Sequence, residues 1–367
     1  MRAHLGVLAS GITLLLFSNF SYSHEKAPPI FRVSEIRDAN NPLNPVFPWA
    51  INDLGATAGL AFTSDGLRTP FLWSRGRIFE LASSEVLRPA EALGINDRGQ
   101  VVGIGNRLDE TGLDTVRGFV WTHGKLTDIG DLPGGIKWSV AYAINNRGEV
   151  VGASESTNGR EAVLWSHGHL MSLGDLPGGA VYAHAFAIND RGVIVGQGQT
   201  DTGDQAFIWR EGVMSALPVP AGAISSEAVA INNYNTSAGV VRTGGTTFAA
   251  VVWEGTKLEA LPYLSSEFRF AHANGINNRG DVVGANATIE GPSDALRVGI
   301  PVATLWHQGI PYSLNNLIDE DDPLKACVDL QLAQAINDGG QIAVEGVNRC
   351  ENSGSTVFIL SPVRRRY

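Results

Sequence analysis

Four acid–base side chains occupy the same place in a motif that recurs along this sequence of 367 residues. Each stands four residues before an isoleucine that is followed by asparagine, and the four are Glu91, His184, Glu227 and His272. Carboxylates and imidazoles are the groups that proteins use most often as general acids and bases. If the fold brings these positions together, they form a ring that could bind a polar ligand or transfer protons.

Three further residues with suitable chemistry lie near these positions: Trp138, Tyr182 and Arg269. The whole set is also compatible with an ordinary solvated rim, and the sequence leaves that alternative open. Two histidines and two carboxylates would suffice for a metal ion, but their positions follow none of the usual ligand spacings of metal sites. We therefore expect neither a metal nor another cofactor.

The motif that carries these side chains is Ala/Gly-Ile-Asn-Asp/Asn, and it occurs seven times. We call its isoleucines the motif isoleucines and number the repeats one to seven in chain order. The motif isoleucines are Ile51, Ile95, Ile144, Ile188, Ile231, Ile276 and Ile336, with spacings of 44, 49, 44, 43, 45 and 60 residues. A period of about 40–50 residues is typical of propellers and solenoids.

Each repeat shows short β-branched or aromatic runs separated by Gly, Asn and Asp, and no segment has a sustained helical period. The seventh repeat stops after its third run, residues 357–360, while residues 31–36 before the first repeat resemble the missing fourth run. The sequence therefore predicts an all-β fold. We expect a seven-bladed β-propeller with four-stranded blades, in which the N-terminal strand completes the last blade.

Several recurring residues are explained by folding alone. The Asn after each motif isoleucine, with a glycine three residues later, matches a type I turn with a bulge whose last residue needs positive φ; repeat five has Asn235 there. The residues one and three before the motif isoleucine are small, so strand alternation predicts that they share one face where inner strands converge. A third-strand Trp in six repeats, and Phe358 in the last, predicts packing between blades.

Conspicuous length variation is confined to one kind of loop. Insertions fall at residues 106–117 and 287–300, between second and third strands, and at 319–329, between two repeats. Because chain direction alternates within a blade, these segments lie on the same face of the predicted propeller. Binding loops on a rigid scaffold are expected on that face.

The first 23 residues combine Arg2, an apolar run and small residues before residue 24, which is the pattern of a secretory signal peptide. A transmembrane anchor is the alternative, although the run is short and interrupted by Ser and Gly. We expect residues 24–367 to form one domain without a membrane-spanning segment, located outside the cell or in the periplasm. Cys327 and Cys350 are then expected to form a disulfide. The net charge of −10 argues against nucleic acid as a partner.

The repeated pattern [AG]-I-N-[DN]-x-G-x-V-V-G, followed by a Trp and by L-G-x-L-P-G-G, resembles the HAF-repeat family of extracellular bacterial proteins. The closest stretches are residues 141–179 and 185–217. Repeat seven departs from the pattern, with Val344 in place of the second-strand glycine. The resemblance implies export and a propeller fold. It implies no chemistry, so it assigns no functional residues.

Taken together, these features favour binding over catalysis. We expect a secreted or periplasmic recognition scaffold for a protein, a glycan or an envelope component. The alternative is a propeller-type hydrolase or lyase that acts on a saccharide or small ester, with the two glutamates and two histidines as acid–base groups. A purely structural surface protein is the third hypothesis.

Overall fold

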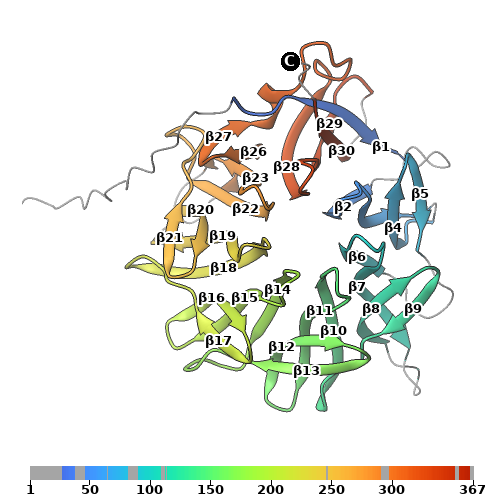
Figure 1. Cartoon of the computed structure of the whole chain (residues 1–367), viewed down its shortest axis with the longest axis vertical. Helices are drawn as coiled ribbons and strands as arrows, with labels where there is room; N and C mark the ends of the chain where they lie inside the picture. Colours follow the sequence, from blue (N-terminus) through green and yellow to red (C-terminus); the bar gives the residue numbers. More distant parts are fainter. Residues whose placement is uncertain are drawn as a thin grey trace, which may run out of the picture.

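The computed structural model describes residues 27–37, 46–63, 65–81, 90–108, 112, 114–244, 247–290, 297–351 and 355–363. They form an all-β fold, as predicted, in which antiparallel strands surround a common centre (Figure 1). Among these residues, no helix has the length and apolar character needed to cross a bilayer. The proposed signal peptide, residues 1–23, lies outside the described residues.

Each repeat contributes strands in the same order from the centre outward. The first, inner strands are β2 (Val46–Ile51), β6 (Ala90–Ile95), β10 (Gly134–Ile144), β14 (Ala183–Ile188), β18 (Ala223–Ile231), β22 (Phe270–Ile276) and β28 (Val328–Ile336). The second strands are β3 (Thr57–Phe62), β7 (Val101–Leu108), β11 (Val150–Ser156), β15 (Ile194–Thr200), β19 (Thr236–Thr243), β23 (Val282–Ala287) and β29 (Ile342–Asn348). The third strands are β4 (Arg68–Ser74), β8 (Asp114–Thr122), β12 (Gly159–Ser166), β16 (Gly203–Arg210), β20 (Thr247–Glu254), β26 (Val302–His307) and β30 (Ser355–Pro362).

The fourth, outer strands are β5 (Arg77–Glu80), β9 (Lys125–Asp128), β13 (His169–Gly174), β17 (Val213–Ala216), β21 (Lys257–Ala260) and β27 (Ile310–Ser313). A two-stranded ribbon, β24 (Ile289–Glu290) with β25 (Arg297–Val298), and the short 3-10 helix η1 (Leu314–Leu317) complete the elements. Three sheets have four strands, and two have eight because a single parallel bridge joins two neighbouring repeats.

The N-terminal strand β1 (Phe31–Ile36) pairs antiparallel with β30, in the sheet order β1-β30-β29-β28. The other edge of β1 is covered by the segment that follows η1 and contains Asp319 and Asp322. The buried carboxylate of Asp322 accepts a hydrogen bond of 2.8 Å from the Val33 N–H, and the Asp319 N–H donates to the Phe31 carbonyl at 2.8 Å. These contacts satisfy backbone groups that an open sheet edge would expose.

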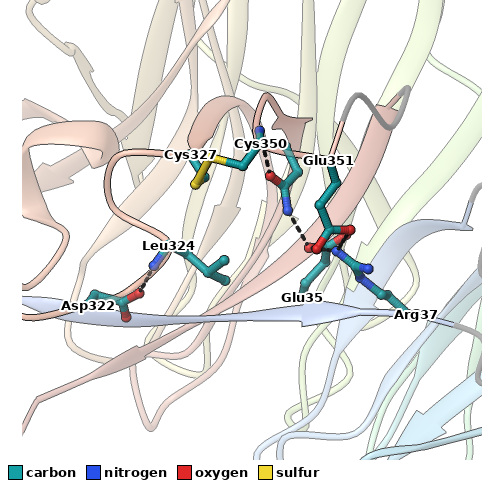
Figure 2. The surroundings of a disulfide bond; sticks show 8 residues. Glu35, Arg37, Asp322, Leu324, Cys327, Cys350 and Glu351 are labelled. Atoms are coloured by element: carbon teal, nitrogen blue, oxygen red, sulfur yellow. Dashed lines mark hydrogen bonds and ion pairs between the residues drawn. A yellow bond between two sulfur atoms is a disulfide. The ribbon is translucent and has the colours of Figure 1, made fainter.

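Cys327 and Cys350 form the predicted disulfide, which lies beside β1 (Figure 2). The Cys350 N–H donates to Asn348 Oδ1 at 3.1 Å, and Asn348 Nδ2 donates to Glu35 Oε2 at 2.9 Å. Glu35 also pairs with Arg37 at 2.7 Å. The disulfide is therefore connected through polar side chains to the strand that joins the two ends of the chain.

Apolar clusters fill the space between consecutive repeats, and one such cluster joins repeat seven to repeat one. The third-strand aromatic residues pack into these clusters, as predicted. Trp253 and Trp306 are fully buried, and their indole N–H groups donate to the carbonyls of Pro218 and Pro262 at 2.8 and 2.7 Å.

The prediction that the two small residues before each motif isoleucine share a face is wrong. Ala143, one before its isoleucine, and Ala185, three before the next, meet in one cluster between repeats three and four. The first therefore faces the following repeat, and the second faces the preceding repeat. Alternation fails because a β-bulge lies between these positions, with a register shift from Ala141 to Ala143.

The turn after each inner strand has the predicted conformation. In repeat one, the Gly55 N–H donates to the Asn52 carbonyl at 3.0 Å. The last turn residue has φ between +67° and +84° in all seven repeats, including Asn235 at +67°. Asn tolerates this region better than other residues with a side chain, so repeat five keeps the turn without glycine.

The asparagine after each motif isoleucine links its repeat to the next. Its Oδ1 accepts backbone N–H groups of its own turn, while its Nδ2 donates to the backbone carbonyl of the equivalent asparagine in the following repeat. Asn337 of repeat seven donates to Asn52 of repeat one at 2.8 Å. We call these seven side chains the asparagine ring; all are buried.

A second ring follows one residue later. The backbone N–H of each residue donates to the side-chain Oδ1 of its equivalent in the next repeat. Four members are carboxylates, Asp53, Asp97, Asp190 and Asp338, and these turns line a cavity of about 170 Å³. Burial raises the pKa of Asp53. This end of the repeat axis is therefore acidic.

Deleting residues 30–37 should abolish cooperative unfolding, because β30 would lose its partner and the cluster around Phe31 and Val33 would lose two buried side chains. Calorimetry would measure this. Arg32→Ala is the control: this exposed residue pairs with Asp319 at 3.5 Å, and surface pairs contribute little. A deletion variant that unfolds like the full chain would contradict the pairing of β1.

Asn189→Ala should lower the free energy of unfolding by about 1–3 kcal/mol, since it leaves buried backbone groups of two repeats without partners. Urea titration would measure the change. Asn158→Ala, at an exposed turn, should stay within about 0.5 kcal/mol of the parent. Equal losses in the two variants would show that the ring contributes nothing specific.

Candidate functional site

A β-bulge interrupts all seven inner strands at the same position. In each pairing with the second strand, the register shifts between the residues three and one before the motif isoleucine. The residue between them has no partner in the ladder. We call these unpaired residues the bulge residues; they are Trp49, Leu93, Tyr142, Phe186, Val229, Asn274 and Gln334.

The second-strand glycine allows the close backbone approach at the bulge. A Cβ atom added at Gly196 would lie 1.9 Å from the carbonyl oxygen of His184, so no other residue fits there. Five other repeats have the same glycine in the same contact. In repeat seven Val344 replaces it, and the bulge between Ala333 and Ala335 is retained.

The seven bulge residues and His272 line a cavity of about 240 Å³ on the repeat axis, which we call the axial cavity. Neighbouring inner strands contact one another in repeat order, and β28 contacts β2. Because the bulge residues follow this order around the axis, the lining has two chemically different sides. The bulge residues of repeats one to five form an apolar arc, and those of repeats six and seven form a polar arc with His272.

Two polar atoms of the lining residues have no partner within the described part of the chain. Trp49 Nε1 and His272 Nδ1 are buried and make no hydrogen bond there. The other ring nitrogen of His272 lies 2.9 Å from Glu227 Oε1. A buried donor or acceptor without a partner costs about 1–3 kcal/mol, so each atom would be stabilised by a hydrogen-bonding partner.

His184 lies at the centre of an aromatic group between the rim and the axial cavity. Its Nδ1 is 3.0 Å from the Tyr142 hydroxyl, and its ring stacks on Phe186 with centroids 5.7 Å apart. The rings of Tyr182 and Trp138 lie 5.0 and 6.5 Å away. Burial, assisted by the charge of Arg160, lowers the pKa of His184 to about 4, so the ring is neutral at pH 7.

Arg160, Trp138 and Tyr182 form a second surface at the rim, which we call the rim platform. The guanidinium carbon lies 4.1 Å from the Trp138 ring centroid and 5.3 Å from that of Tyr182. A salt bridge of 2.7 Å to Glu155 holds the arginine in place. Tyr182 is 39% exposed, so its ring is available to a ligand.

The predicted site residues therefore form two groups, and two of them lie apart. Trp138, Tyr182 and His184 come together, and Glu227 and His272 form a pair. Glu91 is separate and pairs with Arg68 at 2.6 Å. Arg269 is exposed and makes backbone contacts to Phe248 and Ala287; neither it nor Glu91 lines the axial cavity.

The sequence prediction missed all seven bulge residues, of which only Tyr142 carries a titratable group. A signal was available, because no two repeats share a residue at the bulge position, whereas the positions on either side of it hold Ala or Gly in nearly every repeat. Glu345 was missed as well. It accepts a hydrogen bond of 2.7 Å from Gln334, and burial raises its pKa.

Within the described ranges, no group of three His, Cys, Asp or Glu side chains is arranged to hold a metal ion. The acid–base groups near the axis are instead engaged in pairs.

His184 should make stability depend on pH. Its pKa is about 4 in the folded protein against 6.5 normally, so the unfolded chain takes up the proton first as the pH falls. Up to ~3 kcal/mol should be lost between about pH 6.5 and 4, and none above that range. In urea titrations His184→Phe should reduce this loss, whereas His169→Phe, at an exposed site, should retain it. An unchanged loss in His184→Phe would rule out His184 as its source.

The sequence matches no family model and no curated protein. Solved structures do match. The β-propeller domain of the Trilobed protease from Pyrococcus furiosus has 9% identity over 88% of this chain and 98% of that chain, with a TM-score of 0.53. An oligogalacturonate lyase from Vibrio parahaemolyticus has 10% identity over 90% and 97%, with a TM-score of 0.53.

A puromycin-hydrolysing peptidase from Mycobacterium tuberculosis has 12% identity over 93% of this chain, with a TM-score of 0.55. This chain spans 56% of that peptidase. At such low identity, these likenesses concern the fold alone. The chain is similar in fold to β-propellers.

Proposed function

We propose that this protein is an exported binding scaffold that holds its ligand in the axial cavity. The observation that carries the proposal is the contrast at the inner strands. The small residues, the motif isoleucine and the ring asparagine recur with folding roles, whereas the bulge residues differ in every repeat and line one cavity. Variation on a uniform scaffold is typical of binding positions.

The proposal includes a propeller of seven blades, one for each repeat, with β1 completing the seventh. The order β1-β30-β29-β28 supports this, as do the hydrogen bond from Asn337 to Asn52 and the apolar cluster between repeats seven and one. We place the protein with HAF-repeat proteins on its repeated pattern. The disulfide is compatible with an extracellular or periplasmic location, which the signal-peptide pattern of residues 1–23 also favours.

A hydrolase or lyase is the second candidate function. Its support is the Glu227–His272 pair, 2.9 Å apart, because His272 lines the axial cavity. Against it, His184 has its Nδ1 engaged by Tyr142, and Glu91 is paired with Arg68 away from the lining. Turnover of a saccharide or ester that Glu227→Gln abolishes would favour the enzyme over the scaffold.

A thermal-shift screen of saccharides, peptides and small metabolites should test the site. A ligand at about 100 times its Kd stabilises the folded protein by about 2.7 kcal/mol. Hits should stabilise the parent and Tyr234→Ala, whose exposed ring lies in the repeat-five turn on the acidic end. They should not stabilise Trp49→Leu or Phe186→Val, variants in which the bulge residues of repeats two and five replace an aromatic ring. Hits that depend on Tyr234 instead would place binding at the wrong end for this proposal.

A further inference from the structure

The chemistry of the axial cavity narrows the class of ligand. The apolar arc presents the rings of Trp49, Tyr142 and Phe186. The polar arc contains Asn274 and Gln334, whose amide nitrogens donate to the Ala333 carbonyl and to Glu345, so their amide oxygens are the groups left for a ligand. A ligand that satisfies both must have an apolar face and hydrogen-bonding groups on the opposite side. A volume of about 240 Å³ is below the ~300–1,000 Å³ of sites for drug-sized molecules, which suits a group the size of one ring.

The lining carries little charge. Among the described residues no Lys, Arg, Asp or Glu belongs to it, and the two carboxylates beside the polar arc, Glu227 and Glu345, are engaged by His272 and by the amide of Gln334. An anionic ligand would need a cationic partner in such a site, and a cationic ligand would need a carboxylate. The ligand group in the cavity is therefore expected to be neutral.

Trp49 Nε1 and His272 Nδ1 are buried and unpaired, and a rotation of either side chain toward the cavity would let a ligand hydroxyl satisfy it. The indole Nε1 of Trp49 can only donate, whereas His272 Nδ1 donates or accepts according to its tautomer. A hydroxyl group accepts from the first and serves the second in either state. A hydroxylated ring with C–H faces, such as a pyranose, meets these requirements together with those of the aromatic arc.

The aromatic surface continues from the cavity to the rim. His184 contacts both Tyr142 and Phe186 of the cavity and lies next to Tyr182 and Trp138 of the rim platform. A second ring attached to the first would rest on this platform, where Arg160 offers additional donors. The described lining residues of the axial cavity are all different from those of the acidic cavity at the other end, so the two cavities are separate candidate sites.

We infer that the axial cavity binds the terminal ring of a neutral saccharide, with the adjoining ring on the rim platform. This inference rests on the proposed function and names its ligand class. Recognition combines stacking on the apolar arc with hydroxyl hydrogen bonds to the polar arc.

Titration calorimetry with defined probes tests the inference. The probes are maltotriose, cellotriose and chitotriose as neutral saccharides, trigalacturonate as an acidic one, and an uncharged Tyr-containing tetrapeptide. We expect at least one neutral trisaccharide to bind. Trp49→Leu and Phe186→Val should weaken it about tenfold, or ~1.4 kcal/mol, while Tyr234→Ala leaves it unchanged.

Two further variants separate the parts of the site. Asn274→Val introduces the bulge residue of repeat five and should weaken binding of the trisaccharide. An apolar ligand would bind this variant as tightly as the parent or more tightly. Tyr182→Ala should weaken the trisaccharide but not the corresponding monosaccharide, because only the longer ligand reaches the platform. Circular dichroism of each variant would verify folding.

The remaining outcomes overturn the inference in distinguishable ways. Binding of trigalacturonate or the peptide in place of neutral saccharides, with the same dependence on Trp49 and Phe186, would refute the ligand class and leave axial binding intact. Saccharide binding that is unchanged in both Trp49→Leu and Phe186→Val would refute the ligand class and the proposed function together. No binding of any neutral probe at millimolar concentration would refute the saccharide inference alone.

Discussion

The structure depends on one repeated interaction, the hydrogen bond from an asparagine amide to the backbone of the next repeat. Asn189 is typical: its Oδ1 accepts two backbone N–H groups of its own turn, and its Nδ2 donates to the Asn232 carbonyl. One buried side chain thus sets the conformation of a turn and the distance to the neighbouring repeat. An aspartate would lack the donor, and an alanine would leave backbone groups unsatisfied.

This arrangement makes the two ends of the repeat axis different. At the asparagine end, the ring asparagines and the residues directly after them bond to the neighbouring repeat, so replacing one of them disturbs two repeats. The other end begins at the bulges. There, one residue of each inner strand has no partner in the β-ladder, and its side chain lines the axial cavity. In repeats one to six a second-strand glycine lies against the bulged inner strand, where a Cβ atom would collide with a backbone carbonyl oxygen, whereas repeat seven keeps the bulge opposite Val344.

The electrostatic character of the two ends follows from the same division. Asp53, Asp97, Asp190 and Asp338 converge at the asparagine end. Near the opposite end, burial keeps His184 neutral, and Arg160 is neutralised by Glu155 while two aromatic rings cover it. The two ends of the axis therefore differ in charge and in aromatic content.

Much of this fold is predictable from the sequence because its determinants are local and repeated. The positive φ at Asn235, the partner of residues 31–36 and the disulfide all follow from turn chemistry, strand order and cysteine count. The bulge was not predictable from alternation. It is a shift in the register between the inner and second strands, which arises only when the two strands pair.

The candidate site was predictable in part for the same reason. Trp138, Tyr182 and His184 were identified by residue type, but their meeting with Arg160 requires the packing of β12 against the segment before β14. By itself, the sequence determined the repeat, the turns and the strand order, because each is encoded within a few neighbouring residues. Only the tertiary structure decided which residues face the axis, because that depends on bulges and on contacts between repeats more than forty residues apart.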